Sequence, residues 1–177
     1  HDALRTIAGQ GGDVVITVDC GITSVAEAGT ARQLGLTLII TDHHRPHVGE
    51  SLRDSNSAVS EKLPHAAAIV HPGLPGSSYP FAGLCGAGVA LKVAWALCQR
   101  ACEAKRVSEP MRLCLMRAVG LAAIGTIADV VPLVDENRAL AAAGLRALAA
   151  TRRPGLQALM RCAGVDPATV DSGAVGF

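Results

Sequence analysis

The stretch Leu36-Thr37-Leu38-Ile39-Ile40-Thr41-Asp42-His43-His44-Arg45-Pro46 decides the fold. Its apolar and β-favouring residues predict a buried strand, and Pro46 prevents a regular strand or helix from continuing. One acid and two histidines therefore follow the carboxyl end of this strand. In an open parallel sheet, ligands bind in the crevice beyond the strand ends. The stretch thus predicts a ligand-binding cluster that contains Asp42, His43 and His44.

A second strand signal lies upstream, where Val14 to Val18 is a run of β-favouring residues that ends at Asp19-Cys20-Gly21. The residues from Val25 to Leu34 predict a helix that stops at Gly35, a residue type favoured just after a helix. Strand, helix and strand within about 30 residues indicate a right-handed βαβ unit with parallel strands. Asp19 and Asp42 should therefore meet at the same edge of the sheet.

The remainder of the chain predicts an α/β fold, a parallel sheet flanked by helices. A polar loop covers residues 45–65 and a third strand covers 66–70, closed by His71-Pro72. The later helices are expected from Leu84, over 110–128, over 136–149 and over 154–164, followed by an irregular tail.

The composition of the chain limits the classes of protein to which it can belong. The 177 residues carry a net charge of +1 and are half apolar, which suits one globular domain or most of one. No run approaches the roughly 18 uninterrupted apolar residues that a membrane span requires, so no membrane is expected. The neutral charge and the four aromatic residues give no support to a nucleic-acid-binding surface within this chain.

The six cysteines show neither CxxC nor zinc-ribbon spacing. Four of them fall in apolar helical patterns, which favours buried, reduced thiols. Together with the lack of an export signal at the start of the chain, this predicts a cytoplasmic protein.

The candidate chemistry rests on Asp19, Asp42, His43, His44 and Asp129, the last being the sole charged residue between 118 and 133. Carboxylates and imidazoles bind Mn²⁺, Mg²⁺ or Zn²⁺, and a carboxylate can bridge two ions. Two ions about 3.5–4 Å apart can clamp a phosphoryl group and activate water. Each residue also has a structural interpretation: Asp19 could form a turn, the histidine pair could be a surface turn, and Asp129 could end its helix.

Two other features of the sequence give weaker indications of a functional site. Residues 83–88, rich in glycine, could offer amides to a phosphate, but they lack a Walker lysine, and close packing is the simpler interpretation. Cys20 lacks a matching histidine motif for nucleophilic catalysis.

Four segments resemble the catalytic core of the DHH phosphoesterase family: VDCGIT (18–23), TDHH (41–44), GTIADVVPL (125–133) and ENR (136–138). The resemblance is greatest to its exonucleases specific for single-stranded DNA, and it extends through YPFAGLCGAGVALK (79–92) and RPGLQALM (153–160). It implies that residues 1–150 are a partial catalytic domain and that 151–177 begin the connection to a further domain.

The resemblance also implies roles. Two ions, Mn²⁺ or Mg²⁺, would be held by Asp19 as the bridging acid, by His43 and by Asp129. His44 would be a catalytic residue that faces the scissile phosphate and binds the substrate. Asp42 would be the second catalytic residue, which orients the histidine pair or approaches a metal as a supporting residue behind its direct ligands. The implied activity is 5′-to-3′ hydrolysis of single-stranded DNA in repair and recombination, with a single-strand-binding protein or a helicase as candidate protein partners.

Several features depart from the family pattern. The family's first motif, an Asp-Tyr-Asp-like strand end, and its associated substrate-binding domain do not occur in this sequence, and His71-Pro72 stands where Asn-Pro is expected. We therefore expect residues 1–177 alone to bind metal weakly and to have little nuclease activity. Three alternatives remain open: a DHH phosphoesterase acting on oligoribonucleotides, cyclic dinucleotides or pyrophosphate, a catalytically dead DHH scaffold, and a nucleotide-binding domain without metal.

Overall fold

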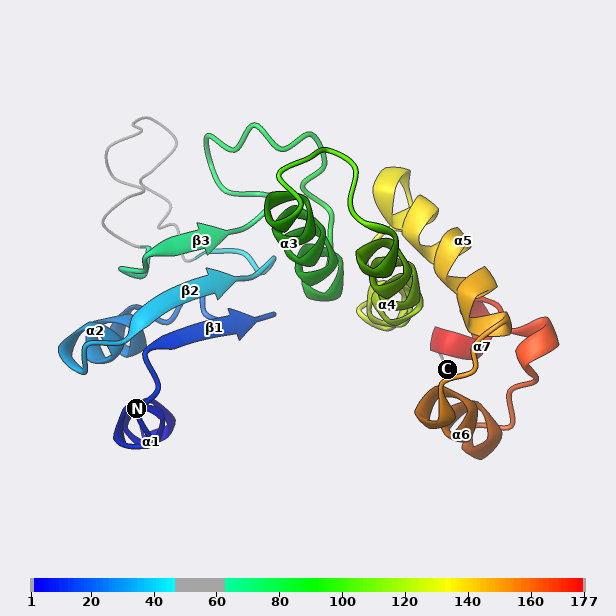
Figure 1. Cartoon of the computed structure of the whole chain (residues 1–177), viewed down its shortest axis with the longest axis horizontal. Coiled ribbons are helices and arrows are strands. Elements are labelled where there is room, and N and C mark those ends of the chain that lie inside the picture. Colours follow the sequence, from blue (N-terminus) through cyan, green and yellow to red (C-terminus); the bar gives the residue numbers. More distant parts are fainter. Residues whose placement is uncertain (1, 47–62, 177) are drawn as a thin grey trace. The chain divides into compact units, whose positions relative to one another are not determined.

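The strand that carries the histidine pair lies at the centre of a small parallel sheet. The structure, a computed structural model, describes residues 2–46 and 63–176. Within these residues the sheet has the order β1 (Val14–Val18), β2 (Thr37–Thr41), β3 (Ala68–Val70), as Figure 1 shows. Ile16 pairs with Ile39, and Ile40 pairs with Ile69. The predicted parallel βαβ unit is confirmed, and all three strands end at the same edge.

Two helices pack on one face of this sheet. They are α1 (Asp2–Gly9) and α2 (Val25–Gln33), and the chain leaves α2 through Gly35 at a φ of 72°, the conformation expected after a helix end. The buried core of this layer consists of Ala28, Ala31, Leu36, Leu38 and Ile40, with α1 contributing Leu4, Ile7 and Ala8 at its border. The β2 strand is therefore held from the α2 side by close packing of small and branched side chains.

The opposite face of β1 is apolar and open to solvent. Val14, Ile16 and Val18 alternate with the inward-facing residues of the strand, and each is more than half exposed. Only the helix-covered face of the sheet thus supplies the core described above.

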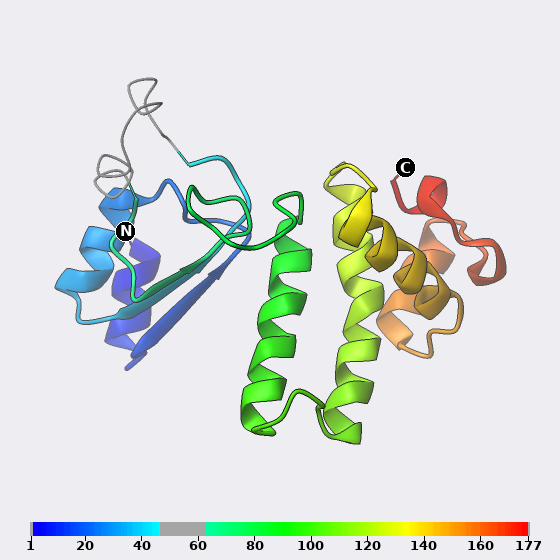
Figure 2. The ribbon, with the colours of Figure 1, turned by 90° about the horizontal axis from the view of Figure 1, so that it is seen from above.

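The residues after the sheet form a group of helices. The bounds are α3 (Gly86–Ala101), α4 (Glu109–Ala128), α5 (Asp135–Ala149), α6 (Pro154–Cys162), a 3₁₀ turn η3 (Pro167–Thr169) and α7 (Ser172–Gly176). Helix α4 packs against both α3 and α5, and Figure 2 shows α3 and α4 running side by side. The four longer helices match the sequence prediction closely. The prediction of an irregular tail was wrong, because η3 and α7 are each shorter than two turns and carry little periodic signal.

Close helix contacts depend on glycine at two positions. A Cβ on Gly144 would lie 2.1 Å from Ala123 Cβ, and a Cβ on Gly125 would lie 2.5 Å from Ala87 Cβ. Helices α4 and α5, and helices α3 and α4, therefore approach more closely than a larger residue would allow. The 83–88 segment also packs: Gly88 is buried against Leu84, as the simpler interpretation of this motif predicted.

Asn137 ties the start of α5 to the segments around it. Its side chain is fully buried, and Nδ2 donates hydrogen bonds to Gly83 O at 2.6 Å and to Pro132 O at 3.0 Å. An amide is suited to this place because it satisfies two carbonyls without burying a charge.

By compactness the chain divides into two units, His1–Ala82 and Gly83–Phe177. This division falls inside the 1–150 catalytic domain implied by the family resemblance, and the extent of that domain stays a prediction. Most of the polar loop predicted for 45–65 lies outside the described residues.

Helix α4 has the length and apolar composition of a membrane-spanning helix, but this is weak evidence because the core helices of soluble proteins have the same properties.

The expectation that the cysteines are mostly buried was wrong. Only Cys85 is fully buried, and Cys20, Cys114 and Cys162 are exposed, because an apolar helical pattern does not show which side of a helix is covered. All six are free thiols.

Candidate metal centre

The turn after β1 presents Asp19 in an unusual backbone conformation. Asp19 has a φ of 66°, in the left-handed region, and Gly21 follows at 113°. Three hydrogen bonds fix the turn: Asp19 N–H donates to Thr41 O at 2.9 Å, the Thr17 hydroxyl to Cys20 O at 2.6 Å, and the Thr41 hydroxyl to Thr17 O at 2.7 Å. A strained residue held by its surroundings in this way is typical of functional sites.

The turn after β2 is organised by the buried carboxylate of Asp42, which is only 1% exposed. Its Oδ1 accepts hydrogen bonds from the amides of His43 at 2.7 Å and His44 at 3.2 Å. Its Oδ2 accepts the Ile22 amide at 2.9 Å, which joins this turn to the one after β1. Asp42 therefore holds together the two strand ends that carry the candidate ligands.

These contacts set the charge of Asp42. Burial alone would raise the pKa of its carboxyl, because a low-dielectric surrounding disfavours the charged form. Hydrogen bonds from the Ile22 amide, from the His44 ring and from the amides of His44 and His43 outweigh burial and place the pKa of Asp42 below its ordinary value. Asp42 is thus an ionised hydrogen-bond acceptor at neutral pH.

Asp42 also determines the orientation of the His44 ring. His44 Nδ1 lies 2.7 Å from Asp42 Oδ1, and because an ionised carboxylate can only accept, Nδ1 carries the proton. The lone pair of the neutral imidazole is then on Nε2, which is the nitrogen that can accept a proton or bind a metal. This carboxylate–histidine pairing is the arrangement that orients histidines around metals.

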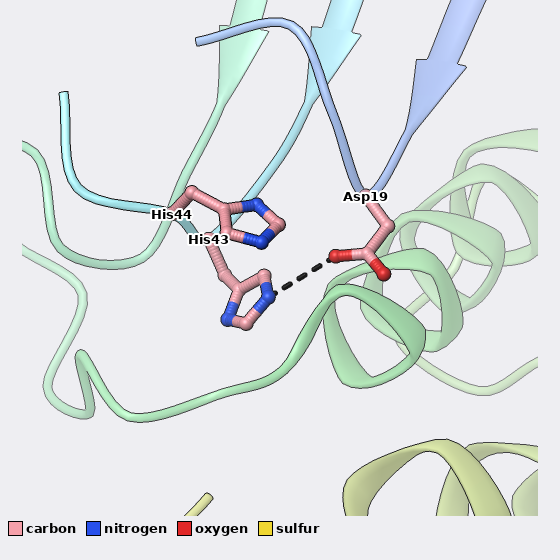
Figure 3. Close-up of side chains that lie close together, drawn as sticks. All are labelled: Asp19, His43 and His44. Carbon is pink, nitrogen blue, oxygen red and sulfur yellow. Dashed lines mark ion pairs between the residues drawn. The ribbon is translucent and has the colours of Figure 1, made fainter. Parts of the chain in front are cut away.

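Three side chains meet beyond the strand ends. His43 Nε2 lies 3.1 Å from Asp19 Oδ1, and the ring centroids of His43 and His44 are 4.4 Å apart. One ligand atom from each of Asp19, His43 and His44 lies within 4.8 Å of the others, as Figure 3 shows for the three side chains. His43 is largely buried, whereas half of the Asp19 side chain is exposed.

The donor set fits a divalent cation. One carboxylate and two imidazoles converge from two neighbouring turns, and this mixture of oxygen and nitrogen donors suits Mn²⁺ and Zn²⁺, with Mg²⁺ favouring the carboxylate. Of the five residues singled out in the sequence, the structure brings these three together and places Asp42 beneath them as their organiser.

Asp129 lies in the second unit and is described there by itself. It is the C-cap of α4, it is exposed, and its amide donates to Gly125 O at 2.9 Å. Asp129 thus lies at the end of its helix, as the structural interpretation of this residue allowed. Its role as a metal ligand stays a prediction from the family resemblance.

Two contributors to the site were missed by the sequence reasoning. The Ile22 amide binds Asp42, and nothing in an isoleucine signals a main-chain contact 20 positions away. His71, the residue after β3, contacts the main chain of His44. The sequence did contain a signal for His71, because His71-Pro72 follows a predicted strand and the strand ends of a parallel sheet lie at the edge where ligands bind.

Comparison with known proteins identifies the family of the chain. The sequence matches the DHH family, N-terminal domain, over residues 2–126. It is 43% identical over 177 residues to the single-stranded-DNA-specific exonuclease RecJ of Bacillus subtilis, covering 100% of this chain and 19% of that protein. It is 34% identical over 174 residues to RecJ of Escherichia coli, covering 95% of this chain and 27% of that protein. The chain thus spans less than a third of the length of these relatives.

Solved structures of RecJ proteins are also similar to this chain. A crystal structure of RecJ in complex with Mn²⁺ from Thermus thermophilus matches with a TM-score of 0.74 and 32% identity, covering 99% of this chain and 23% of that one. A crystal structure of exonuclease RecJ bound to manganese matches with a TM-score of 0.73 and 31% identity, covering 99% and 38% respectively.

Proposed function

The chain belongs to the DHH family, and from this premise we propose that it supplies metal ligands to a phosphodiesterase that degrades single-stranded DNA from the 5′ end. The observation that carries the proposal is the convergence of Asp19, His43 and His44 beyond the ends of two parallel strands. The similarity to proteins named single-stranded-DNA-specific exonucleases supports the choice of substrate.

We assign the cofactor as two divalent ions, Mn²⁺ or Mg²⁺. Structures of relatives bound to manganese support this choice, as does the donor set of Asp19 and His43. Asp129 is the further acid that the family resemblance adds. When bound, such ions neutralise charge on the phosphate and lower the pKa of water, so that no side-chain base is needed.

Two further residues have proposed roles at this site: His44 binds the substrate, and Asp42 orients His44. His44 presents Nε2 and is proposed to bind the scissile phosphate, as a hydrogen-bond donor once it is protonated. Asp42 keeps the His44 ring in this orientation through the 2.7 Å contact to Nδ1 and compensates the charge of an imidazolium. Replacing His44 should therefore reduce turnover more than it reduces metal affinity.

The experiment that tests the function is an exonuclease assay with the full-length protein. A 5′-labelled oligonucleotide should lose its label as mononucleotide from the first time point, in Mn²⁺ or Mg²⁺, whereas a 3′-labelled oligonucleotide should shorten from the unlabelled end. Blunt duplex DNA of the same sequence is the control substrate and should be degraded far more slowly. Asp19→Ala and His43→Ala should abolish the activity, because each removes a proposed ligand.

The same assay separates the alternatives. Preferential hydrolysis of dinucleotides, cyclic dinucleotides or pyrophosphate would assign the chain to another DHH activity. Lack of hydrolysis of every substrate, with normal folding, would favour the scaffold. We propose the cytoplasm as the compartment and a single-strand-binding protein or a helicase as partner. A change in the initial rate when either is added would support that partner.

A further inference from the structure

We propose that His71 is a positioning residue, whose imidazole holds the main chain of His44 in place at the edge of the metal centre. The proposal deepens the proposed function and rests on it, because it concerns the residue assigned to the scissile phosphate. His71 is neither a metal ligand nor a catalytic residue in this proposal.

The topology places His71 where such a contact can form. His71 directly follows β3, as Asp42 directly follows β2, and the parallel pairing of Thr41 with Val70 brings both residues to the same edge. The Asp42 amide donates to Val70 O at 3.1 Å, so the two strand ends are joined immediately before the turn. From there His71 Nε2 reaches His44 O, at 2.8 Å.

Both ring nitrogens are used, and together they define one tautomer. The Gly73 amide donates to His71 Nδ1 at 3.0 Å, so Nδ1 has no proton. The proton of the neutral ring is therefore on Nε2, and Nε2 donates to the His44 carbonyl, which can only accept. A single protonation state satisfies both contacts.

Pro72 determines which backbone amide can bind the His71 ring. The residue before a proline is restricted to extended backbone, and Pro72 itself is buried and has no amide hydrogen. Gly73 is thus the first residue after His71 whose amide can cap the side chain. An asparagine at position 71, the residue expected from the family resemblance, could form the same turn with Gly73. Its shorter side chain places no donor at the position of Nε2, so an asparagine there cannot make the contact with His44.

His44 is therefore held on both sides by hydrogen bonds. Asp42 Oδ1 holds its amide and its ring Nδ1, and His71 holds its carbonyl. Fixing the main chain in this way fixes where His44 Nε2 lies. A displacement of about 1 Å at such a residue can cost up to about 100-fold in rate.

The test compares three substitutions that separate the two contacts. Glutamine places an amide nitrogen close to the position of Nε2 and keeps the contact with His44. Asparagine keeps only the contact with Gly73, and alanine removes both. We expect kcat on single-stranded DNA to fall about tenfold in His71→Ala and His71→Asn and to stay within about twofold of wild type in His71→Gln. His65→Ala, at an exposed histidine, is the matched control.

Two further measurements distinguish positioning from a general effect on folding. Mn²⁺ affinity, measured by calorimetry, should be unchanged in all three variants, because His44 is assigned to the phosphate and the metal ligands are Asp19, His43 and Asp129. In ¹⁵N-histidine-labelled wild type, the His71 ring, identified by its loss in His71→Gln, should show a proton on Nε2. Equal kcat in His71→Asn and His71→Gln, or a proton on Nδ1, would overturn the proposal. Should the wild type prove inactive on DNA, the proposed function fails, while the ¹⁵N spectrum still tests the contact.

Discussion

Asp42 and Ile22 are joined by a 2.9 Å hydrogen bond from the Ile22 amide to Asp42 Oδ2, across 20 positions of sequence. This bond links the turn after β1 to the turn after β2. The same carboxylate also holds the amides and one ring of the histidine pair. Stability and the geometry of the metal centre therefore depend on the same side chain.

The first prediction is that Asp42→Asn destabilises the protein by about 3 kcal/mol, because hydrogen bonds to a buried charged acceptor are strong and an amide nitrogen would face a backbone N–H. Urea unfolding followed by circular dichroism measures the change. Asp13→Asn, at an exposed residue before β1, is the control and should change the free energy of unfolding by less than about 0.5 kcal/mol. Equal stability of the two variants would contradict the role of Asp42.

The second prediction concerns pH. Because the folded-state pKa of Asp42 is below its ordinary value, ionisation of Asp42 stabilises the fold above the unfolded-state pKa. This contribution is lost as pH falls through the folded-state pKa. The difference in unfolding free energy between wild type and Asp42→Asn should therefore shrink as pH is lowered from about 5 to 2. A difference that is constant over this range, in parallel urea titrations, would show that the charge is not what stabilises the turn.

The third prediction concerns the metal ligands. Supporting residues around metal sites typically contribute 10–100-fold to affinity, so loss of a direct ligand in Asp19→Ala or His43→Ala should weaken Mn²⁺ binding about 100-fold or more. Calorimetric titration of the full-length protein measures this, with Asp13→Ala as the control. Asp129→Ala tests the role taken from the family resemblance in the same titration. Unchanged affinity in Asp129→Ala would remove that residue from the ligand set and leave the other assignments intact.

The fourth prediction concerns the turn after Asp19. Gly21 has a φ of 113°, and a Cβ there would lie 3.1 Å from Thr17 Oγ1 and 3.3 Å from Ile40 Cγ2. Gly21→Ala should destabilise the protein by about 1–3 kcal/mol, because the conformation is unfavourable for a residue with a Cβ. Gly29→Ala is the matched control, since nothing lies within 4 Å of its Cβ in α2, and it should stabilise by about 0.5–1 kcal/mol. Thermal unfolding should shift in opposite directions for the two variants.

The fifth prediction concerns the helices. Gly144→Ala should destabilise the second unit by about 1–3 kcal/mol, because the added Cβ would meet Ala123 Cβ at 2.1 Å and Val119 O at 2.8 Å, forcing α4 and α5 apart. Gly155→Ala, in the open first turn of α6, is the control and should have little effect. Similar unfolding temperatures for the two variants would mean that the helix contact is looser than described.

The sequence alone determined the elements that bring the site together. The β-favouring runs before Asp19 and Asp42, with Gly35 between them, are sufficient to predict a parallel βαβ unit, because strand length, helix length and turn chemistry are local properties. Parallel strands necessarily end at one edge, which is why Asp19 and the histidine pair could be grouped without coordinates. The long helices were equally accessible from their periodic pattern.

Only the tertiary structure decided which atoms meet. The burial of Asp42, its bond to the Ile22 amide and the reach of His71 to the His44 carbonyl depend on strand register and on turns 20 to 27 positions apart, which no local pattern encodes. The exposure of three of the six cysteines was missed for the same reason. The short helices at the end of the chain were missed because they carry little periodic signal. Local propensity selects the elements, whereas hydrogen-bond partners are selected by packing among residues distant in sequence.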